Sequence, residues 1–296
     1  MSVQSRDLQM ISVERTCGFG EKKRRQGSIK LRRKRRQRAR RLCMGFMVVC
    51  AGLIVVISYK SNGLMQLPAM DSGEAQVQGL QEKIIREESR ETYPKELAEL
   101  LEQNKETYDF VENYPNRETY AGKEIDLSDD VTSGSVPLLM QWDKRWGYDM
   151  YGDSMIGIAG CGPVCMTMAY LYFTEDLEMN PRQMAEFAQN QGYHSKEGTS
   201  WEFWTSGAKG LGLFGEVISL NENVMKTVLD CGGLIVCSMS PGDFTTQGHY
   251  ILLRGYDENG FFVNDPNRRE NSEKQWDFQT LSHQIKNLWG IYDPGR

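Results

Sequence analysis

The sequence has few of the residues on which many enzyme classes depend. Histidine occurs only three times in 296 residues, as His194, His249 and His283. Seven cysteines are present, but none forms a Cys-x2-Cys pair, which argues against a structural zinc site and, with the odd number, against a disulfide framework. The phosphate-binding pattern Gly-x4-Gly-Lys-Ser/Thr is absent, so the chain carries no ATP-binding cassette. No internal repeat occurs at solenoid periods.

Positive charge is scarce after residue 41. Residues 1–41 hold 15 Lys/Arg and 3 Asp/Glu, a net +12, whereas the remaining 20 Lys/Arg and 37 Asp/Glu give residues 42–296 a net −17. Like charges in blocks repel, so we expect the leader to be disordered by itself. Binding of nucleic acid or a cytoplasmic partner is the alternative. No aromatic residue is interleaved with the basic blocks, and nucleic-acid binding is not favoured.

One segment lacks charge altogether. Residues 42–59, LCMGFMVVCAGLIVVISY, are uncharged over 18 positions, and as a helix they would be ~27 Å long, close to the thickness of a bilayer core. The alternatives are a cleaved signal peptide, which is rarely preceded by so long a basic region, and a core helix, which would have a polar face. We expect a single-pass anchor in the lipid bilayer, with the N-terminus in the cytoplasm and the acidic part outside.

The chain divides into five expected segments: a basic cytoplasmic tail (1–41), a transmembrane helix (42–59), a linker (60–80), a helical lead-in or stalk (81–135) and a main domain (136–296). Periodicity and turn residues predict helices over 162–173, 181–191, 200–210, 223–230 and 278–288, and strands over 233–239, 249–256 and 260–265. Helices come first and strands later, which favours an α+β fold over a doubly wound sheet. Helices within 81–113 are expected to dock on the main domain, with a free stalk as the alternative.

One stretch joins a cysteine to a helix-start signal: Gly160-Cys161-Gly162-Pro163, followed by an apolar run. Proline suits the first turn of a helix, because its φ is fixed and its missing N–H would have no acceptor there. We expect a helix to begin near Gly162 or Pro163, with Cys161 at its entrance. Unpaired N–H groups and the positive end of the helix dipole favour a thiolate there, and the thiolate is the nucleophilic form. The alternative is a small buried core cysteine, which is our interpretation of Cys165.

A predicted hairpin brings one histidine close to a carboxylate. His249 begins an apolar, β-favouring run, and a polar turn leads into a second run that ends at Asp265. If Tyr256 faces Gly260, residue 251 opposes Asp265, and His249 and Asp265 are diagonal neighbours on one face, ~7–8 Å apart. A slip of one residue would place them on opposite faces. The alternative is an aspartate that only ends a strand beside an edge histidine.

These residues define a candidate catalytic site. Cys161 is the candidate nucleophile, His249 the general base and Asp265 the group that orients it. Transition-state charge also needs hydrogen-bond donors, for which the N–H of Cys161 and the side chain of Gln141 are candidates, with a plain surface residue as the alternative for Gln141. His194 and His283 are expected at the surface. Four tryptophans are candidates for the wall of a substrate groove, although aromatic residues are more often core: Trp142, Trp146, Trp201 and Trp204.

Three motifs in chain order, Gly160-Cys161-Gly162-Pro163, Gly248-His249-Tyr250 and Asn264-Asp265-Pro266, resemble the papain-like cysteine peptidases related to bacteriocin-leader processing, the peptidase C-thirty-nine-like group. The stretches 136–143 and 198–201 match as well, and the resemblance covers roughly residues 93–292. It implies a papain-like α+β fold, in which a helix carrying the nucleophile packs on an antiparallel sheet. It also implies hydrolysis of peptide bonds through a thioester on Cys161, with His249 as base and acid and Asp265 as orienting group.

The chain departs from the transporter-fused members of that group. Those members carry the oxyanion glutamine close ahead of the cysteine, whereas Gln141 lies 20 positions upstream of Cys161 here. No ATP-binding cassette follows, so cleavage of double-glycine leaders during export is not implied. We expect a membrane-anchored, extracytoplasmic thiol hydrolase that acts on peptides or protein segments, with cell-wall peptides as a second option. A non-catalytic peptide-binding module is the rival hypothesis. No metal or organic cofactor is implied.

Overall fold

The computed structural model describes residues 72–85 and 93–295. The expected cytoplasmic tail and transmembrane helix, residues 1–59, lie outside this part of the chain, as does most of the linker. Within the described part, no helix combines the length and the apolar character needed to cross a bilayer. The membrane anchor therefore stays a prediction from composition.

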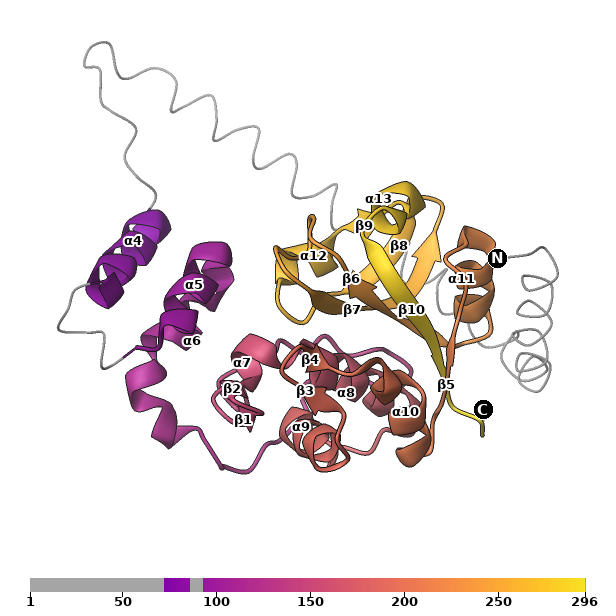
Figure 1. The fold of residues 1–296 in the computed structure, drawn as a ribbon, viewed down its shortest axis with the longest axis horizontal. Coiled ribbons are helices and arrows are strands. Elements are labelled where there is room, and N and C mark those ends of the chain that lie inside the picture. Colours follow the sequence, from indigo (N-terminus) through magenta and orange to yellow (C-terminus); the bar gives the residue numbers. More distant parts are fainter. Residues whose placement is uncertain (1–71, 86–92, 296) are drawn as a thin grey trace, which may run out of the picture.

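The described chain forms a helical half and a sheet half, with a group of N-terminal helices beside them (Figure 1). The helices are α4 (Ser72–Ile85), α5 (Lys95–Gln103), α6 (Tyr108–Glu112), α7 (Ile156–Ala159), α8 (Cys161–Thr174), α9 (Pro181–Asn190), α10 (Ser206–Gly210), α11 (Glu222–Asp230), α12 (Arg269–Glu273) and α13 (Phe278–Ser282), with 3-10 helices η2 (Lys105–Thr107), η3 (Tyr114–Thr119) and η4 (Trp201–Trp204). The strands are β1 (Met150–Tyr151), β2 (Ser154–Met155), β3 (His194–Ser195), β4 (Gly198–Thr199), β5 (Phe214–Val217), β6 (Leu234–Met239), β7 (His249–Asp257), β8 (Gly260–Asn264), β9 (Gln275–Trp276) and β10 (Ile285–Tyr292).

The main sheet has six strands in the order β5-β10-β6-β7-β8-β9, and every neighbouring pair is antiparallel. Its alternate side chains fill two separate cores, because successive residues of a strand point to opposite faces. Val236 and Leu252 pack in the core that contains α8 and α9. Ile235 and Ile251 pack in the second core, with apolar residues of α11 and α13. The expected α+β class with an antiparallel sheet is confirmed, and this arrangement is consistent with a papain-like fold.

Helix α8 is the centre of the helical half. Most of its residues are buried on all sides, because α9 lies along one side and β7 along another. Because the helix is buried on several sides, its sequence is an apolar run without a polar face. The helix therefore carries its first residue, Cys161, on a rigid support at the junction of the two halves.

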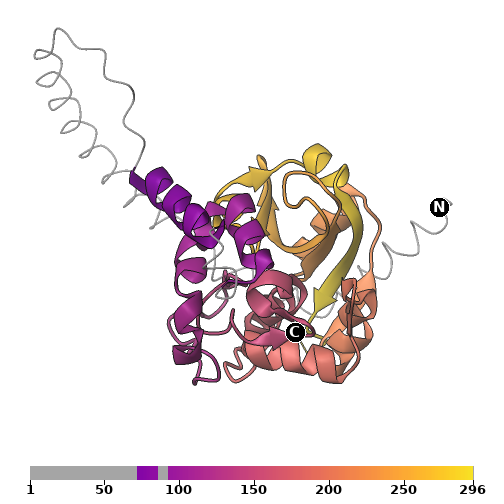
Figure 2. The ribbon, with the colours of Figure 1, turned by 60° about the vertical axis from the view of Figure 1, so that its left-hand side comes forward.

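The N-terminal helices pack against the main domain along one flank (Figure 2). Leu97 and Leu101 of α5 and Phe110 of α6 are almost fully buried and form a third core with Tyr148 and Met155. Their apolar residues recur at helical spacing, so one face of each short helix is covered. In the structure, α5 and α6 are docked, and α5 also contacts α7 beside the first turn of α8.

Two predicted helices differ from the structure. The helix expected over 200–210 is broken at Thr205, whose backbone (φ −118°, ψ −74°) separates η4 from α10. The helix expected over 278–288 ends at Ser282, and the chain continues as β10, a central strand of the sheet. Strand β10 is buried on both faces, so it lacks the alternation of apolar and polar residues that would have marked it as a strand.

Candidate active site

Cys161 is the first residue of α8, slightly earlier than the start expected near Gly162 or Pro163. The glycines on either side of it permit a close approach of the backbone. A Cβ on Gly160 would lie 2.5 Å from Ile156 Cγ2, and a Cβ on Gly162 would clash with Thr199 Oγ1. The first turn of α8 can therefore pack tightly against α7 and β4. This packing fixes the position of the half-buried Cys161.

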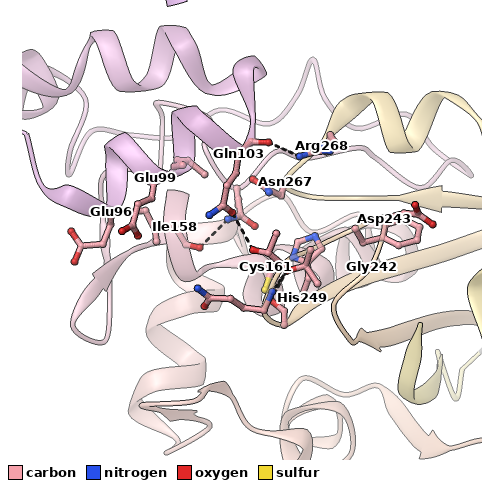
Figure 3. A pocket seen from close by; sticks show the side chains of 17 residues that line it. Glu96, Glu99, Gln103, Ile158, Cys161, Gly242, Asp243, His249, Asn267 and Arg268 are labelled. Atoms are coloured by element: carbon pink, nitrogen blue, oxygen red, sulfur yellow. Dashed lines mark hydrogen bonds between the residues drawn. The ribbon is translucent and has the colours of Figure 1, made fainter. Parts of the chain in front are cut away.

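His249 and Asp265 are in direct contact. His249 Nε2 lies 2.7 Å from Asp265 Oδ1, and both side chains are almost fully buried, 6% and 0% exposed. The carboxylate accepts, so Nε2 carries the proton of this bond. The other ring nitrogen is therefore left for Cys161, which interacts electrostatically with the imidazole. Figure 3 shows Cys161 and His249 next to one another among the residues that line a cavity. The structure thus brings the three predicted catalytic residues together.

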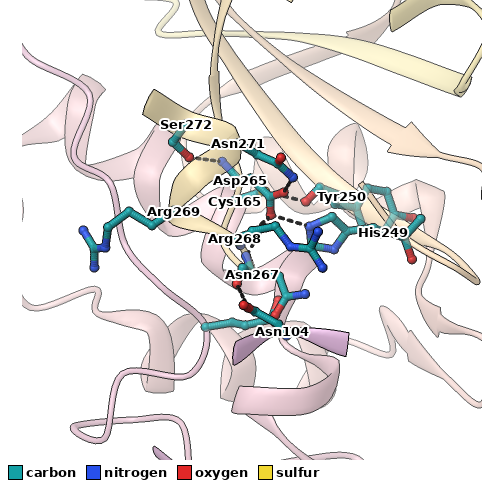
Figure 4. Close-up of polar contacts among 12 residues, drawn as sticks. Asn104, Cys165, His249, Tyr250, Asp265, Asn267, Arg268, Arg269, Asn271 and Ser272 are labelled. Atoms are coloured by element: carbon teal, nitrogen blue, oxygen red, sulfur yellow. Dashed lines mark hydrogen bonds and ion pairs between the residues drawn. The ribbon is translucent and has the colours of Figure 1, made fainter. Parts of the chain in front are cut away.

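The carboxylate of Asp265 is held by several further donors (Figure 4). Oδ1 accepts from the backbone N–H groups of Asn267 (2.8 Å) and Arg268 (3.2 Å). Oδ2 accepts from Asn271 Nδ2 at 2.7 Å. Burial by itself would raise the pKa of Asp265, but the charge of His249 and these hydrogen bonds lower the pKa below its usual value. Asp265 is therefore ionised and fixed in orientation.

The pKa of His249 is raised, and the cause is electrostatic. Burial of the ring lowers this pKa, but the charge of Asp265, the hydrogen bond to it and the interaction with Cys161 outweigh burial and raise the pKa well above its usual range. The imidazolium form of His249 is consequently favoured at neutral pH. A cationic imidazole next to a cysteine is the arrangement by which thiol nucleophiles are activated in general.

The hairpin register near the turn differs from the expected one. Asp257 pairs with Gly260, and Tyr256 pairs with Phe261, so the expected pairing of Tyr256 with Gly260 is wrong. The turn is therefore shorter by one residue than the sequence suggested. If this register continued along both strands, every later residue would change its face relative to the partner strand.

A β-bulge between Leu253 and Gly255 corrects the register. Beyond it Leu252 pairs with Asn264, and continuing this register places Asp265 opposite residue 251, as expected. The bulge adds one residue to β7, and without it His249 and Asp265 would lie on opposite faces. The residue at the bulge is Arg254, whose Nε donates to Asn264 Oδ1 at 2.8 Å and ties the bulged strand to β8.

Gln141 lines the same cavity as Cys161 and is only 3% exposed, so the surface alternative is wrong. Its Nε2 donates to the carbonyls of Gly157 (3.0 Å) and Ile158 (3.2 Å), just ahead of α8, and its Oε1 has no hydrogen-bond partner within the described part of the chain. The backbone N–H of Gln141 donates to Pro266 O at 2.7 Å and so links it to the loop after Asp265. An oxyanion at Cys161 would have to compete with two carbonyls for the amide of Gln141.

The cavity beside Cys161 has a volume of about 420 Å³. Cys161, His249, Gln141 and Ile158 line it. Helix α5 forms one wall and the loop 242–248 forms another, and the loop residues Asn267 and Arg268 contribute a third side (Figure 3). The side chains of α5 that face the cavity are Glu96, Glu99, Leu100 and Gln103. This volume falls within the range of ~300–1,000 Å³ that ligand pockets occupy.

Several predicted candidates lie elsewhere. His194 is half-buried, with its ring 4.5 Å from that of Tyr151, so the expectation of an exposed loop histidine is wrong. His283 is exposed at the end of α13. None of the four tryptophans lines the cavity. Trp146 and Trp204 are core residues, and Trp201 is 44% exposed on the outside. Cys165 is fully buried and packs as expected in the core beneath Cys161.

Sequence reasoning missed two contributions to the site. Asn271, which holds Asp265, lies in a polar run in which no residue stands out, so no signal marked it. The wall formed by α5 comes from a segment more than 50 positions before Cys161. Its acidic residues lie on the exposed side of an amphipathic helix, where charge is ordinary. Within residues 72–85 and 93–295, no group of histidine, cysteine and acidic residues is arranged to hold a metal ion.

Comparison with known families agrees with the geometry. Residues 134–293, more than half of the chain, match the family model described as the Peptidase_C39 like family. The matched region begins just ahead of Gln141 and includes Cys161, His249 and Asp265. It does not include α4, α5 or α6. A search of the curated proteins found no match.

Proposed function

The chain belongs to the Peptidase_C39-like family, and on this basis we propose that it is a cysteine peptidase that hydrolyses peptide bonds with Cys161 as nucleophile. His249 acts as base and acid, and Asp265 orients it. The single observation that carries the assignment is the buried contact of 2.7 Å between His249 Nε2 and Asp265 Oδ1, next to Cys161 on an open cavity. This contact directs the second ring nitrogen of His249 towards the sulfur.

The proposed reaction has two stages: formation of a thioester on Cys161 and hydrolysis of that thioester. The Cys161 thiolate attacks the scissile carbonyl carbon, and the carbonyl oxygen becomes an oxyanion. The proton on His249 passes to the amide nitrogen, the C–N bond breaks, and a thioester to Cys161 remains. Water then attacks the thioester carbon while His249 takes a proton from the water. The C–S bond breaks, the Cys161 sulfur leaves with the electron pair of that bond, and the carboxylic acid product is released. Asp265 stays ionised throughout and stabilises the imidazolium.

The oxyanion is proposed to form next to the first turn of α8. N–H groups in the first turn of a helix have no acceptor within the helix, so the N–H of Cys161 is a suitable donor. Gln141 Nε2 is the second donor in this proposal, released from the carbonyls of Gly157 and Ile158 when substrate binds. The N–H of Cys161 belongs to a rigid part of the protein, which favours stabilisation of charge that develops only in the transition state.

Digestion of an unbiased peptide library by the full-length protein tests this function. We expect cleavage by the wild-type protein, and none by the Cys161→Ala and His249→Ala variants. Alkylation of Cys161 by iodoacetamide near neutral pH should be faster than that of a model thiol, and His249→Ala should abolish the difference. Wild-type protein that binds peptides but does not cleave them, with slow alkylation of Cys161, would replace the peptidase with a peptide-binding module.

We further propose that the domain works outside the membrane, anchored by residues 42–59. The support is composition: 15 Lys/Arg precede an uncharged segment of 18 residues, and an acidic body follows. Peptides or protein segments outside the membrane are then the substrates, with cell-wall cross-bridge or stem peptides as a specific option. Protease added to intact cells should degrade the C-terminal domain and leave the N-terminal tail protected. Protection of both parts would contradict this orientation.

A further inference from the structure

The end of α5 and the segment directly after it are hydrogen-bonded to the loop that follows Asp265. Arg268 Nη2 donates to Gln103 O at 2.6 Å, and Asn104 Nδ2 donates to Asn267 O at 2.6 Å. Asn104 is only 3% exposed and lies more than 150 positions from its partner. Its side-chain oxygen also accepts from the N–H of Glu106 at 3.0 Å, which fixes the start of η2. Figure 4 shows Asn104 pointing at this loop.

Glu106 makes the most specific of these contacts. Its Oε2 accepts from the N–H of Arg269 (2.8 Å) and its Oε1 from the N–H of Glu270 (3.1 Å). These are the first two N–H groups of α12, which has no capping side chain at its own N-cap residue, Arg268. Within the described part of the chain, Glu106 is the acceptor for both groups, which have no acceptor inside their own helix. Glu106 therefore supplies the missing cap of α12 from a distant part of the chain.

Helix α12 is the support of Asp265. Its residue Asn271 donates to Asp265 Oδ2, and the hydroxyl of Ser272 accepts from the N–H of Asp265 at 2.9 Å. The chain of contacts thus runs from Glu106 through α12 to Asp265, and from Asp265 to His249. The five side chains in this chain of contacts are buried or half-buried, which limits the freedom of the loop to rearrange: Glu106, Asn271, Ser272, Asp265 and His249.

We propose that Asn104 and Glu106 are positioning residues of the active site, and that they hold the loop 267–270 and α12 so that Asp265 keeps His249 directed at Cys161. These two residues precede the family-matched region, which begins at residue 134. In this proposal the lead-in segment helps to position the active-site residues of this chain and is more than a stalk. The effect on catalysis rests on the proposed function, whereas the effect on His249 does not.

The test compares Glu106→Gln with Glu102→Gln in the full-length protein. Glu102 is exposed on α5, with no hydrogen bond or ion pair among the described residues, so it is matched in charge and in location. The amide introduced at position 106 can accept from only one of the two N–H groups, and it turns its own donor towards the other. The first readout is the titration of His249 by NMR with labelled histidine, which is tractable because the chain has three histidines.

We expect Glu106→Gln to lower the titration midpoint of His249 by about 0.5–1 pH unit, because the contact with Asp265 loosens. The value of kcat/KM should fall about tenfold, the equivalent of one hydrogen bond to a charged group. Glu102→Gln should change neither quantity. Asn104→Ala should act in the same direction, and Glu106→Asp should restore part of the titration shift because it keeps the charge.

The proposal is overturned if His249 titrates in the Glu106→Gln variant as it does in the wild-type protein, whether or not the variant is less stable. If Glu106→Gln does not fold, Asn104→Ala and Glu106→Asp decide by the same readouts. If the wild-type protein cleaves no peptide, the proposed function fails, but the titration of His249 still decides whether Glu106 positions it.

Discussion

Replacing Asp265 with asparagine isolates the effect of one buried charge. The Oδ1 side of residue 265 receives three donors, from His249, Asn267 and Arg268. An amide placed there must keep its oxygen on this side, because its NH2 group would oppose all three donors. The hydrogen bond to His249 is therefore retained in Asp265→Asn, and the negative charge is lost. Asn271 can turn its own amide to accept from the new NH2 group.

The size of the effect follows from the burial of the pair. Opposite charges ~4 Å apart attract by about 4 kcal/mol at an effective dielectric constant near 20, the equivalent of roughly 3 pKa units. Without the charge, the pKa of His249 falls back to ~6.5 or lower, because burial also lowers it. At pH 8 only about 3% of His249 would then be protonated, whereas at pH 6 about three quarters would be.

The expected result is an activity defect that grows with pH. The value of kcat/KM for Asp265→Asn should fall about 30-fold at pH 8, and no more than about twofold at pH 6 from this cause. The assay is a pH profile of peptide cleavage, with Asp230→Asn, a change of the same charge at an exposed residue, as the control. A defect of equal size at both pH values, or no defect at pH 8, would refute the reasoning.

The same pair predicts an opposite trend in stability. The folded-state pKa of His249 is raised, so its contribution to stability is complete below about pH 6.5 and is lost as the pH rises through the raised value. The pKa of Asp265 is lowered, so its contribution is present above about pH 3.9 and is lost in stronger acid. The difference in Tm between the wild-type protein and Asp265→Asn should therefore be larger at pH 6 than at pH 9. A difference that grows towards pH 9 would contradict this assignment.

Three further substitutions test separate parts of the structure, and Gly248→Ala serves as a control for one of them. Gln141→Ala should lower kcat roughly 100-fold with little change in KM if the amide stabilises an oxyanion. A loss of stability with kcat unchanged would show that Gln141 has only a structural role, through its hydrogen bonds to Gly157 and Ile158. Gly162→Ala places a Cβ against Thr199 Oγ1 and should cost about 1–3 kcal/mol in urea unfolding, whereas Gly248→Ala, which meets nothing within 4 Å, should cost much less. Leu252→Ala, in the core between β7 and α8, should cost about 2–5 kcal/mol by the same measurement, with the slope m unchanged.

Local patterns predicted the elements that carry the catalytic candidates. Helices α8, α9 and α11 and strands β6, β7 and β8 appear within about two residues of their expected bounds. Each of them has a helix-start signal, a turn or a β-favouring run of its own. Strand β10 was missed because it is buried on both faces, so its apolar residues fit a helix as well as a strand. The break between η4 and α10 is at Thr205, next to Trp204, which is fully buried in the core.

The sequence alone determined which side chains could do chemistry. Only one cysteine stands before Gly-Pro at a helix start, only three histidines are available, and one of them begins a hairpin that ends in an aspartate. The family match covers residues 134–293, a range that includes all three of these side chains. These are short-range features, and short-range features are set by the conformational preferences of a few neighbouring residues.

Only the tertiary structure decided how these side chains meet. The faces of His249 and Asp265 depend on one extra residue at the β7 bulge, whereas the turn by itself would separate them. The cap that Glu106 places on α12 joins residues 163 positions apart, and the wall of the cleft comes from α5. Contacts of this kind form because packing brings distant segments together, and no pattern within either segment specifies its partner.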